Sequence, residues 1–287
     1  MTQPPSPPCP LCGAAGRADA GLKIHHPLLR CPSCGLLYSA RIADPDAARY
    51  YEDDREGFFD RPYFDSPADV RIHPEYANYR DGLARVRKSF PGAAPRLLDA
   101  GCGTGALLQA AAELGFAPEG LEVSSVVASR ARHRFKVHLY DGDPERLPAM
   151  EAFDVIVLWD VLEHLPDPVR ALRRFSKLLK PGGRFLLRTI DEDCLLSQWS
   201  LALARCGVMA PARRMHEPYH LVYFDRGTLD LCLRQAGLEA VERWAGEFPV
   251  ERVSRSAWVR LALRGAYLLQ GLARRTYEQY AIAAKHD

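Results

Sequence analysis

Four cysteines near the N-terminus have the spacing of a metal site. The stretches "CPLCG" and "CPSCG" supply Cys9, Cys12, Cys31 and Cys34 in the pattern C-x2-C-x18-C-x2-C. Each pair is followed by glycine and can form a tight turn that directs two thiolates at one ion, and two such turns complete the tetrahedron that zinc accepts. A segment this short cannot bury a useful core, so a metal would hold it folded. We predict a structural zinc ribbon over residues 1–42, in preference to redox-active or unrelated cysteines.

A glycine-rich loop is the second candidate site. In "RLLDAGCGTGALL", residues 96–108, an apolar run that contains Asp99 leads directly into Gly101, Gly103 and Gly105. Glycines let the chain turn sharply and let a ligand touch the backbone, and the start of the following helix attracts negative charge. Glu122, at the end of the next apolar run, can accept both hydroxyls of a ribose. The sequence therefore predicts a site for a nucleoside-bearing cofactor, although the dinucleotide pattern G-x-G-x-x-G is not matched.

The stretch "DVLEHLPDP" is the third candidate. Asp160, Glu163 and His164 stand at i, i+3 and i+4, which predicts one face of a helical turn. His164 could take a proton from a substrate hydroxyl, because the unperturbed pKa of histidine is close to neutrality. Alternatively, Glu163 and His164 only cap and pack this turn.

The elements that must position these residues alternate along the chain. Apolar runs over 96–100, 116–123, 136–140, 153–160 and 183–190 predict strands. Helical patterns over 105–115, 124–135 and 167–183 lie between them, the last with Asp167 as its N-cap. This alternation predicts an α/β fold, a Rossmann-like parallel sheet with right-handed crossovers. Residues 43–90 are charged and aromatic, with helical spacing strongest from Glu75 onward.

Composition limits the possible partners. The 287 residues are 47% hydrophobic with a formal net charge of +2, which suits one large domain or a domain plus a small module. Net charge gives no strong field for nucleic acid or an anionic membrane. No apolar run approaches the roughly 20 residues that span a bilayer. The start, "MTQPPSPPCP", lacks an apolar signal core, so we expect a cytoplasmic protein.

Taken together, these motifs resemble a known family. "LLDAGCGTG" resembles motif I of the class I S-adenosylmethionine-dependent methyltransferases. The resemblance continues in order through Glu122, "DGDPERLP", "FDVIVLWDVLEHLPDP" and "LLKPGGRFLLRT". It implies a seven-stranded, mostly parallel sheet over residues 91–287 whose last strand is antiparallel. Residues 238–246 and 279–287 would be the sixth and seventh strands.

The resemblance also implies roles on the cofactor side. The three glycines would pass under the methionine part of S-adenosylmethionine, with Asp99 near its ammonium group and Glu122 on the ribose. The remaining cofactor contacts would be Val123 beside the adenine, Asp143 near the adenine amine, and Trp159 and Asp160 at the fourth strand. Residues 43–90 would close over the cofactor, with Tyr76, Tyr79 or Arg80 as contacts.

On the acceptor side, the family inserts a substrate cover at about residues 191–225 of this chain, which contain His216 and His220. His220 would face the transferred methyl group or, alternatively, bond the backbone where the cover returns to the core. "DVLEH" also resembles the E-x-x-E-H stretch of ubiquinone-pathway O-methyltransferases, which adds a divalent metal on Asp160, Glu163 and His164 as a third possibility. The catalytic candidates are thus His164, His220 and Glu163.

The sequence leads us to expect methyl transfer from S-adenosylmethionine to a small-molecule acceptor: a sugar, a lipid-like compound or a secondary metabolite. One alternative is an RNA methyltransferase that docks RNA on the ribbon, although the ribbon holds few basic residues: Arg17, Lys23, Arg30 and Arg41. Another is a non-catalytic interaction protein on a degenerate methyltransferase fold. A helix over 255–276 combines an apolar stripe with arginines; we expect it to pack on the sheet, with weak membrane contact or dimerisation as alternatives.

Overall fold

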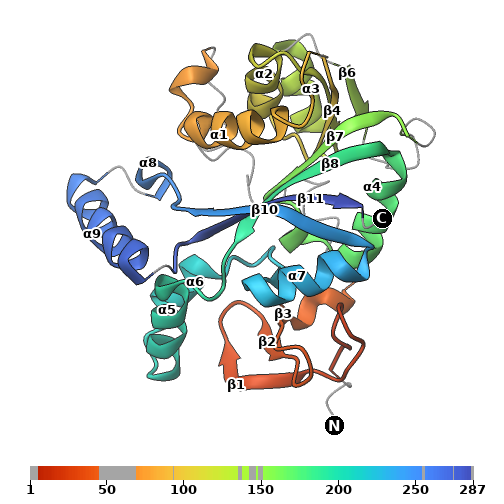
Figure 1. Ribbon diagram of the computed structural model, residues 1–287. Helices are drawn as coiled ribbons and strands as arrows, with labels where there is room; N and C mark the ends of the chain where they lie inside the picture. The colour runs from red at the N-terminus through yellow and green to blue at the C-terminus, as the bar shows by residue number, and fades with distance from the viewer. Residues whose placement is uncertain are drawn as a thin grey trace.

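The chain forms two β-sheets with helices around the larger one (Figure 1). The computed structural model describes residues 6–44, 69–92, 94–134, 138–141, 147, 151–253, 256–273 and 275–285. The larger sheet has seven strands in the order β10-β11-β8-β7-β4-β5-β6, and the smaller has four in the order β1-β2-β3-β9.

The larger sheet confirms the predicted fold class. Its strands are β4 (Arg96–Ala100), β5 (Ala117–Glu122), β6 (His138–Asp141), β7 (Phe153–Trp159), β8 (Leu179–Ile190), β10 (Leu238–Gly246) and β11 (Glu278–Lys285). Strands β6, β5, β4, β7 and β8 pair in parallel, whereas β11 runs antiparallel to both β8 and β10. Because the carboxyl ends of the parallel strands share one edge, residues that follow these strands lie close together.

The described helices lie on both faces of this sheet or, like the last of them, at the margin of the molecule. They are α1 (Tyr76–Arg87), α2 (Ala106–Glu113), α3 (Ser125–Arg134), α4 (Pro168–Leu178), α5 (Leu195–Arg205), α6 (Ala210–Met215), α7 (Arg226–Gln235), α8 (Val250–Val253) and α9 (Ala257–Ala273). In the part of the chain that the structure describes, the 3-10 turns are η1 (Ala40–Ala43), η5 (Val70–Ile72) and η7 (Leu162–His164). Alternate strand residues point to opposite faces. Leu97 and Val157 pack with α1 and α2, whereas Leu98 and Ile156 pack with α4 and α7.

Helix α4 shows how local sequence sets an element's start. The Asp167 side chain accepts a hydrogen bond from the Arg170 amide at 2.9 Å, and Pro168 occupies the first turn. The predicted N-cap is therefore confirmed. The helix ends at Leu178 rather than at residue 183, because the chain enters β8 at Leu179.

The zinc-ribbon segment is joined to the larger domain by strand pairing. β1 (Arg17–Lys23), β2 (Pro27–Arg30) and β3 (Leu37–Ser39) form antiparallel pairs, and β3 also pairs with β9 (Val222–Tyr223). Leu36 and Tyr38 are fully buried in the hydrophobic cluster that also contains Leu221. In Figure 1 these strands lie beside α7, on the side of the large sheet opposite α1. The ribbon and the large domain thus share a core.

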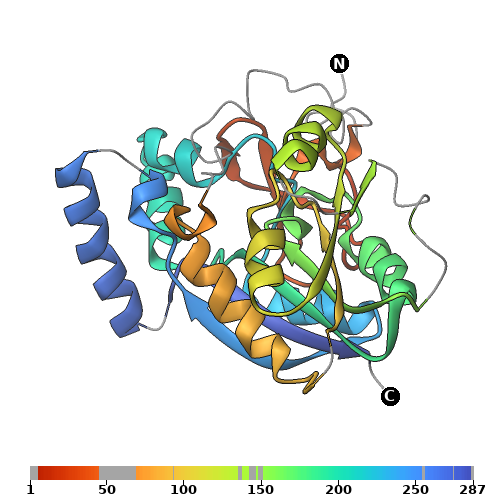
Figure 2. The same cartoon turned by 90° about the horizontal axis from the view of Figure 1, so that it is seen from above.

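Helix α9 corrects one prediction. The helix forms, but its apolar stripe does not pack on the sheet: Trp258, Leu268 and Leu272 are 79%, 66% and 75% exposed. Gln270 is the buried residue of this helix. In both views α9 stands at the margin of the molecule (Figures 1 and 2). Within the described ranges, no helix is long and apolar enough to cross a membrane.

Candidate functional site

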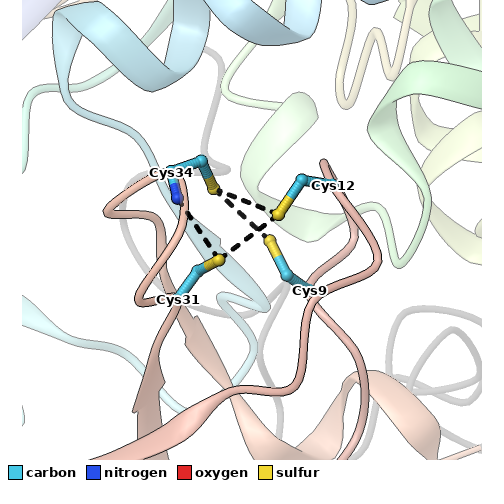
Figure 3. A group of neighbouring side chains, drawn as sticks. All are labelled: Cys9, Cys12, Cys31 and Cys34. Carbon is cyan, nitrogen blue, oxygen red and sulfur yellow. Dashed lines mark hydrogen bonds between the residues drawn. The ribbon is translucent and has the colours of Figure 1, made fainter.

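The four ribbon cysteines converge on one point (Figure 3). The Sγ–Sγ distances are 3.6 Å for Cys9–Cys34, 3.3 Å for Cys12–Cys31 and 3.8 Å for Cys12–Cys34. A zinc ion with Zn–S bonds of about 2.3 Å would place thiolates about 3.8 Å apart. The donor set and its spacing therefore fit a tetrahedral zinc ion.

Both cysteine pairs adopt the same turn. The Gly13 amide donates to the Cys9 carbonyl at 2.9 Å, and the Gly35 amide donates to the Cys31 carbonyl at 3.0 Å. Both glycines have positive φ, 72° and 84°, which side chains other than glycine rarely adopt. Four thiolates complete the coordination of zinc, so this group fits a structural and not a catalytic ion.

The glycine loop lies at the carboxyl end of β4. Gly101, Gly103 and Gly105 all have positive φ, of 87°, 52° and 86°. A Cβ on Gly101 would lie 2.7 Å from a methyl of Val161, so only glycine fits where the loop approaches the segment that follows β7. A Cβ on Gly103 would meet nothing within 4 Å, so the loop is open to a ligand at that residue.

Two buried carboxyl groups flank the loop. Glu122 accepts hydrogen bonds from the amides of Gly103 at 2.8 Å and Ser124 at 2.9 Å. Burial and the charge of Glu122 raise the pKa of Asp99 to about 8, and burial also raises the pKa of Glu122. Val123 is 44% exposed beside Glu122 and could receive a flat ring. Asp143 lies outside the described residues.

Trp159 and Asp160 lie at the end of β7, as predicted. The Trp159 indole is buried against Tyr79 of α1, with ring centroids 5.1 Å apart. Its Nε1 has no hydrogen-bond partner in the described part of the chain. Tyr76 and Arg80 were also predicted as cofactor contacts. The Tyr76 hydroxyl donates to Glu113 at 2.6 Å, and the Arg80 guanidinium lies over the Tyr76 ring, 5.8 Å from its centre.

Arg188 of β8 is a site residue that the sequence reasoning missed. Its guanidinium is 1% exposed, pairs with Asp160 and Glu278, and lies 3.8 Å from Glu75. One buried cation therefore joins β7, β8, β11 and the start of α1. The feature of the sequence that could have identified it is that Arg188 is a charged residue inside the apolar run "GRFLLRTI".

Glu163, His164 and His220 form a compact group, in which His220 comes from a segment far along the chain from the other two. One ligand atom from each lies within 4.8 Å of the others, and the rings of His164 and His220 are 4.8 Å apart. Asp160 is not part of the group: it precedes η7 with a φ of 55° and pairs with Arg188. The three-residue face predicted for Asp160, Glu163 and His164 therefore does not form.

Burial sets the charges in this group. It raises the pKa of Glu163 to about 8, with a further contribution from the charge of Asp160. It lowers the pKa of His164 to about 3 and that of His220 well below its usual value. Within the described chain, Glu163 Oε2 and His220 Nδ1 are buried without a hydrogen-bond partner. The group can therefore accept a substrate proton or bind a divalent cation.

His216 belongs to a different network. Its Nε2 lies 3.0 Å from Glu192 Oε1, which also accepts from the Ser197 hydroxyl at 2.8 Å. All three residues are buried, so the network ties α5 and α6 to the end of β8. His216 thus stabilises the predicted substrate cover, and it also lines a small pocket together with His220. Glu192 and Ser197 had no recognisable pattern in the sequence.

Comparisons with known proteins agree with this geometry. A methyltransferase domain family matches residues 72–243. The ubiquinone biosynthesis O-methyltransferase of Saccharophagus degradans is 32% identical over 213 residues, which cover 71% of this chain and 83% of that protein. The enzyme of the same name from Caulobacter vibrioides is 38% identical over 135 residues, 45% of this chain and 50% of that protein. A third, from Aromatoleum aromaticum, is matched over 66% of its length. The chain thus spans only about half to two thirds of some of these relatives.

Solved structures show the same fold. The complex between the Haloferax volcanii Trm112 methyltransferase activator and a putative methyltransferase matches with a TM-score of 0.55 and 18% identity, over 79% of this chain and 99% of that chain. A putative sarcosine dimethylglycine methyltransferase from Galdieria sulphuraria matches with a TM-score of 0.52 and 15% identity, over 74% and 84%. The chain belongs to the methyltransferase domain family, and its fold is that of the class I S-adenosylmethionine-dependent methyltransferases.

Proposed function

We propose that the protein transfers a methyl group from S-adenosylmethionine to a small-molecule acceptor. The observation that carries the acceptor side is the buried group of Glu163, His164 and His220 at the carboxyl end of β7, one turn from Trp159. The relatives named for ubiquinone biosynthesis support a small acceptor. Whether that acceptor is a sugar, a lipid-like compound or another metabolite is open to the experiment below.

The glycine loop and its carboxyl groups form the proposed cofactor site. S-Adenosylmethionine supplies an electrophilic methyl group on a sulfonium, which is a good leaving group. We assign Asp99 to the ammonium group, Glu122 to the ribose and Val123 to the adenine. Gly103 leaves space for the methionine part to approach the backbone, since no described residue other than its chain neighbours has an atom within 4 Å of its Cβ position.

The chain's own residues then align the acceptor and receive its proton. The acceptor's lone pair forms the bond to the methyl carbon while the carbon–sulfur electron pair passes to sulfur, so alignment and exclusion of water are the main requirements. We assign His220 Nδ1 as the atom that receives the proton of the acceptor, because it is buried and has no hydrogen-bond partner among the described residues. Burial lowers the pKa of His220, so its ring is neutral and can accept a proton, but it is a weaker base than an exposed histidine.

A divalent cation on Glu163, His164 and His220 is the second candidate for this group, because a carboxylate and two neutral imidazoles are suitable ligands. Titration with Mn²⁺, followed by electron paramagnetic resonance, distinguishes the two. Binding in the wild type that is lost in Glu163→Gln would assign a metal. Equal spectra for both proteins would leave the proton-acceptor role.

The ribbon's contacts favour a small acceptor over RNA. Arg30 donates to the Gly35 carbonyl at 3.2 Å, and Arg41 donates to the Pro218 carbonyl at 3.1 Å. Two of the ribbon's four basic residues thus each use a guanidinium donor within the protein, so fewer donors remain for phosphates.

Methyl-labelled S-adenosylmethionine with fractionated cell extract tests the proposal. Label in a low-mass or solvent-extractable product that survives ribonuclease would support a small acceptor and supply a compound to identify. Label that ribonuclease removes from the macromolecular fraction would assign RNA instead. Failure of the purified protein to bind S-adenosylmethionine would favour the non-catalytic alternative.

We also propose weak contact between α9 and an anionic membrane surface. Its stripe is exposed, the helix contains no acidic residue, and Arg260 and Arg264 lie beside the stripe. Flotation with phosphatidylglycerol vesicles should recover the wild type but not Leu268→Gln/Leu272→Gln, and phosphatidylcholine vesicles should recover neither. A dimer in light scattering that the double variant dissociates would assign the stripe to a second copy.

A further inference from the structure

Strand β9 depends on the ribbon for its backbone pairing. It consists of Val222 and Tyr223, which pair with Tyr38 and Leu37 of β3. The Ser39 amide extends this ladder by donating to the Leu221 carbonyl at 2.9 Å. A strand this short has few hydrogen bonds of its own, so the neighbouring strand determines where it lies.

The other side of the same segment contacts the proposed acceptor site. The Leu221 amide donates to the Glu163 carbonyl at 2.7 Å. The ring of His164 bonds the Tyr219 carbonyl through Nδ1 at 3.3 Å. Residues 219–223, which include His220, are therefore held between β3 on one side and η7 on the other.

The proposed zinc site leads directly into β3. The Cys31 amide donates to the Leu36 carbonyl at 2.8 Å, and the Cys34 amide donates to Cys31 Sγ at 3.4 Å. β3 begins at Leu37, the residue after this turn. A metal that fixes the cysteine turn therefore also fixes the first residue of the strand that pairs with β9.

A pocket beside His220 has walls from both parts of the chain. His25 and Leu28 of the ribbon line it together with Glu217, His220 and Tyr223. His25 Nε2 also lies 2.9 Å from the Arg213 carbonyl, at the end of α6. Ribbon side chains thus form part of the wall around His220.

We propose that the zinc ribbon is part of the acceptor site: by adding β3 to β9 it positions His220 against Glu163 and His164. This inference rests on the function proposed above. Ser39 is then a positioning residue that acts through its backbone amide. Asp99, Gly103 and Glu122, which we assigned to the cofactor, lie on β4, on β5 and in the loop after β4, and none of them is in residues 219–223. Loss of the β3–β9 pairing should therefore impair acceptor chemistry and spare cofactor binding.

The pair Ser39→Pro and Ser39→Ala isolates this contact in the full-length protein. Ser39 has a φ of −78°, which proline adopts without strain, but proline has no amide hydrogen to donate to Leu221. Both variants lose the Ser39 hydroxyl, which accepts from the Arg41 amide at 3.2 Å. The difference between them therefore reports the hydrogen bond to Leu221 and the space its donor occupies.

Four measurements are made on each protein: zinc content, affinity for S-adenosylmethionine, amide exchange of residues 219–223, and the ring signals of His220 in nuclear magnetic resonance. We expect Ser39→Pro to keep its zinc and its cofactor affinity within about twofold, while exchange quickens and the His220 signals move. Transfer to the acceptor should fall about tenfold or more, because small displacements of a reacting group have large effects on rate. In Ser39→Ala the exchange and ring signals should remain those of the wild type.

Unchanged exchange and ring signals in Ser39→Pro would overturn the inference, as would an equal loss of cofactor binding and transfer. If Ser39→Pro does not fold, removal of zinc from the wild type by a chelator replaces it: cofactor affinity should stay within about twofold, while exchange of residues 219–223 quickens and the His220 signals move. If the wild type methylates no small acceptor, the proposed function fails. The exchange and His220 signals still decide whether the ribbon positions this residue.

Discussion

Asp99 illustrates how burial can couple cofactor binding to pH. Burial, with the charge of Glu122, raises the pKa of its carboxyl from 3.8 to about 8. Asp99 is therefore mostly protonated at neutral pH in the free protein. A cationic ammonium group beside it would favour the ionised form and lower that pKa.

We accordingly predict that binding of S-adenosylmethionine releases a proton near pH 7 and that affinity rises with pH up to about 8. Titration calorimetry in two buffers of different ionisation enthalpy measures the proton release, and Asp99→Asn, which cannot ionise, should abolish it. Without cofactor, the raised pKa means that the contribution of Asp99 to stability falls as the pH increases from 3.8 to about 8. Proton uptake, or none, would contradict the assignment of Asp99 to the ammonium group.

Arg188 leads to a second prediction at this scale. It is the buried cation between Asp160, Glu75 and Glu278, so Arg188→Met would leave buried carboxylates unpaired. We expect the free energy of unfolding to fall by about 3–5 kcal/mol, measured by urea denaturation. Arg184→Met is the control on the same strand: among the described residues Arg184 donates to the carbonyls of Gly182 and Gly183, and its loss should cost under about 1 kcal/mol. Similar losses in the two variants would refute the role assigned to Arg188.

Single residues were predictable from sequence where a backbone requirement or a fixed spacing dictated their type. The glycines at 101, 103 and 105 do adopt positive φ, and the four cysteines do converge. Arg188, and the Glu192–His216 pair, were not predictable, because each partner lies on a different element and only tertiary packing brings them together. The same reason explains why His220 could not be placed beside Glu163.

At the scale of elements, buried strands were the most predictable. The apolar runs coincide with β4 to β8 within a few residues, and the strand over 238–246, which the family resemblance implied, has the bounds of β10. Strand β9 gave no such signal, because two residues carry no periodicity. Asp160 has a positive φ and is therefore not helical. The turn that its spacing to Glu163 predicted begins after it, at Leu162.

Helix α9 shows that periodicity alone does not say what a helix packs against. Because Leu268 and Leu272 are 66% and 75% exposed, Leu268→Gln/Leu272→Gln should change the free energy of unfolding by less than about 0.5 kcal/mol per site. Leu233→Ala on α7, where the side chain is 1% exposed, should cost about 2–5 kcal/mol by comparison. Urea denaturation of the three proteins provides the measurement. A large loss in the double variant would mean that the stripe is covered within the folded protein.

For the whole molecule, the relation between the two sheets decides how it unfolds. Cys9, Cys31, Leu36 and Tyr38 of the ribbon belong to the same hydrophobic cluster as Phe185 of the central strand β8. Parts that share a core lose their packing together, so we expect one cooperative transition in place of a separate one for each sheet. The sequence suggested a separate module that ends at residue 42. It gave no sign that the fourth strand of the ribbon's sheet comes from residues 222–223.

Cofactor binding should consequently protect the zinc site at a distance. A ligand that binds only the folded protein raises its stability by RT ln(1 + [L]/Kd), about 2.7 kcal/mol at a hundredfold excess over Kd. If the molecule unfolds as one unit, S-adenosylmethionine must raise the temperature of zinc release by as much as it raises the midpoint of helix loss. A chromophoric zinc indicator and circular dichroism, recorded during the same heating, give both temperatures. Zinc release that precedes helix loss and does not respond to the cofactor would show that the ribbon unfolds independently, despite the core it shares with β8.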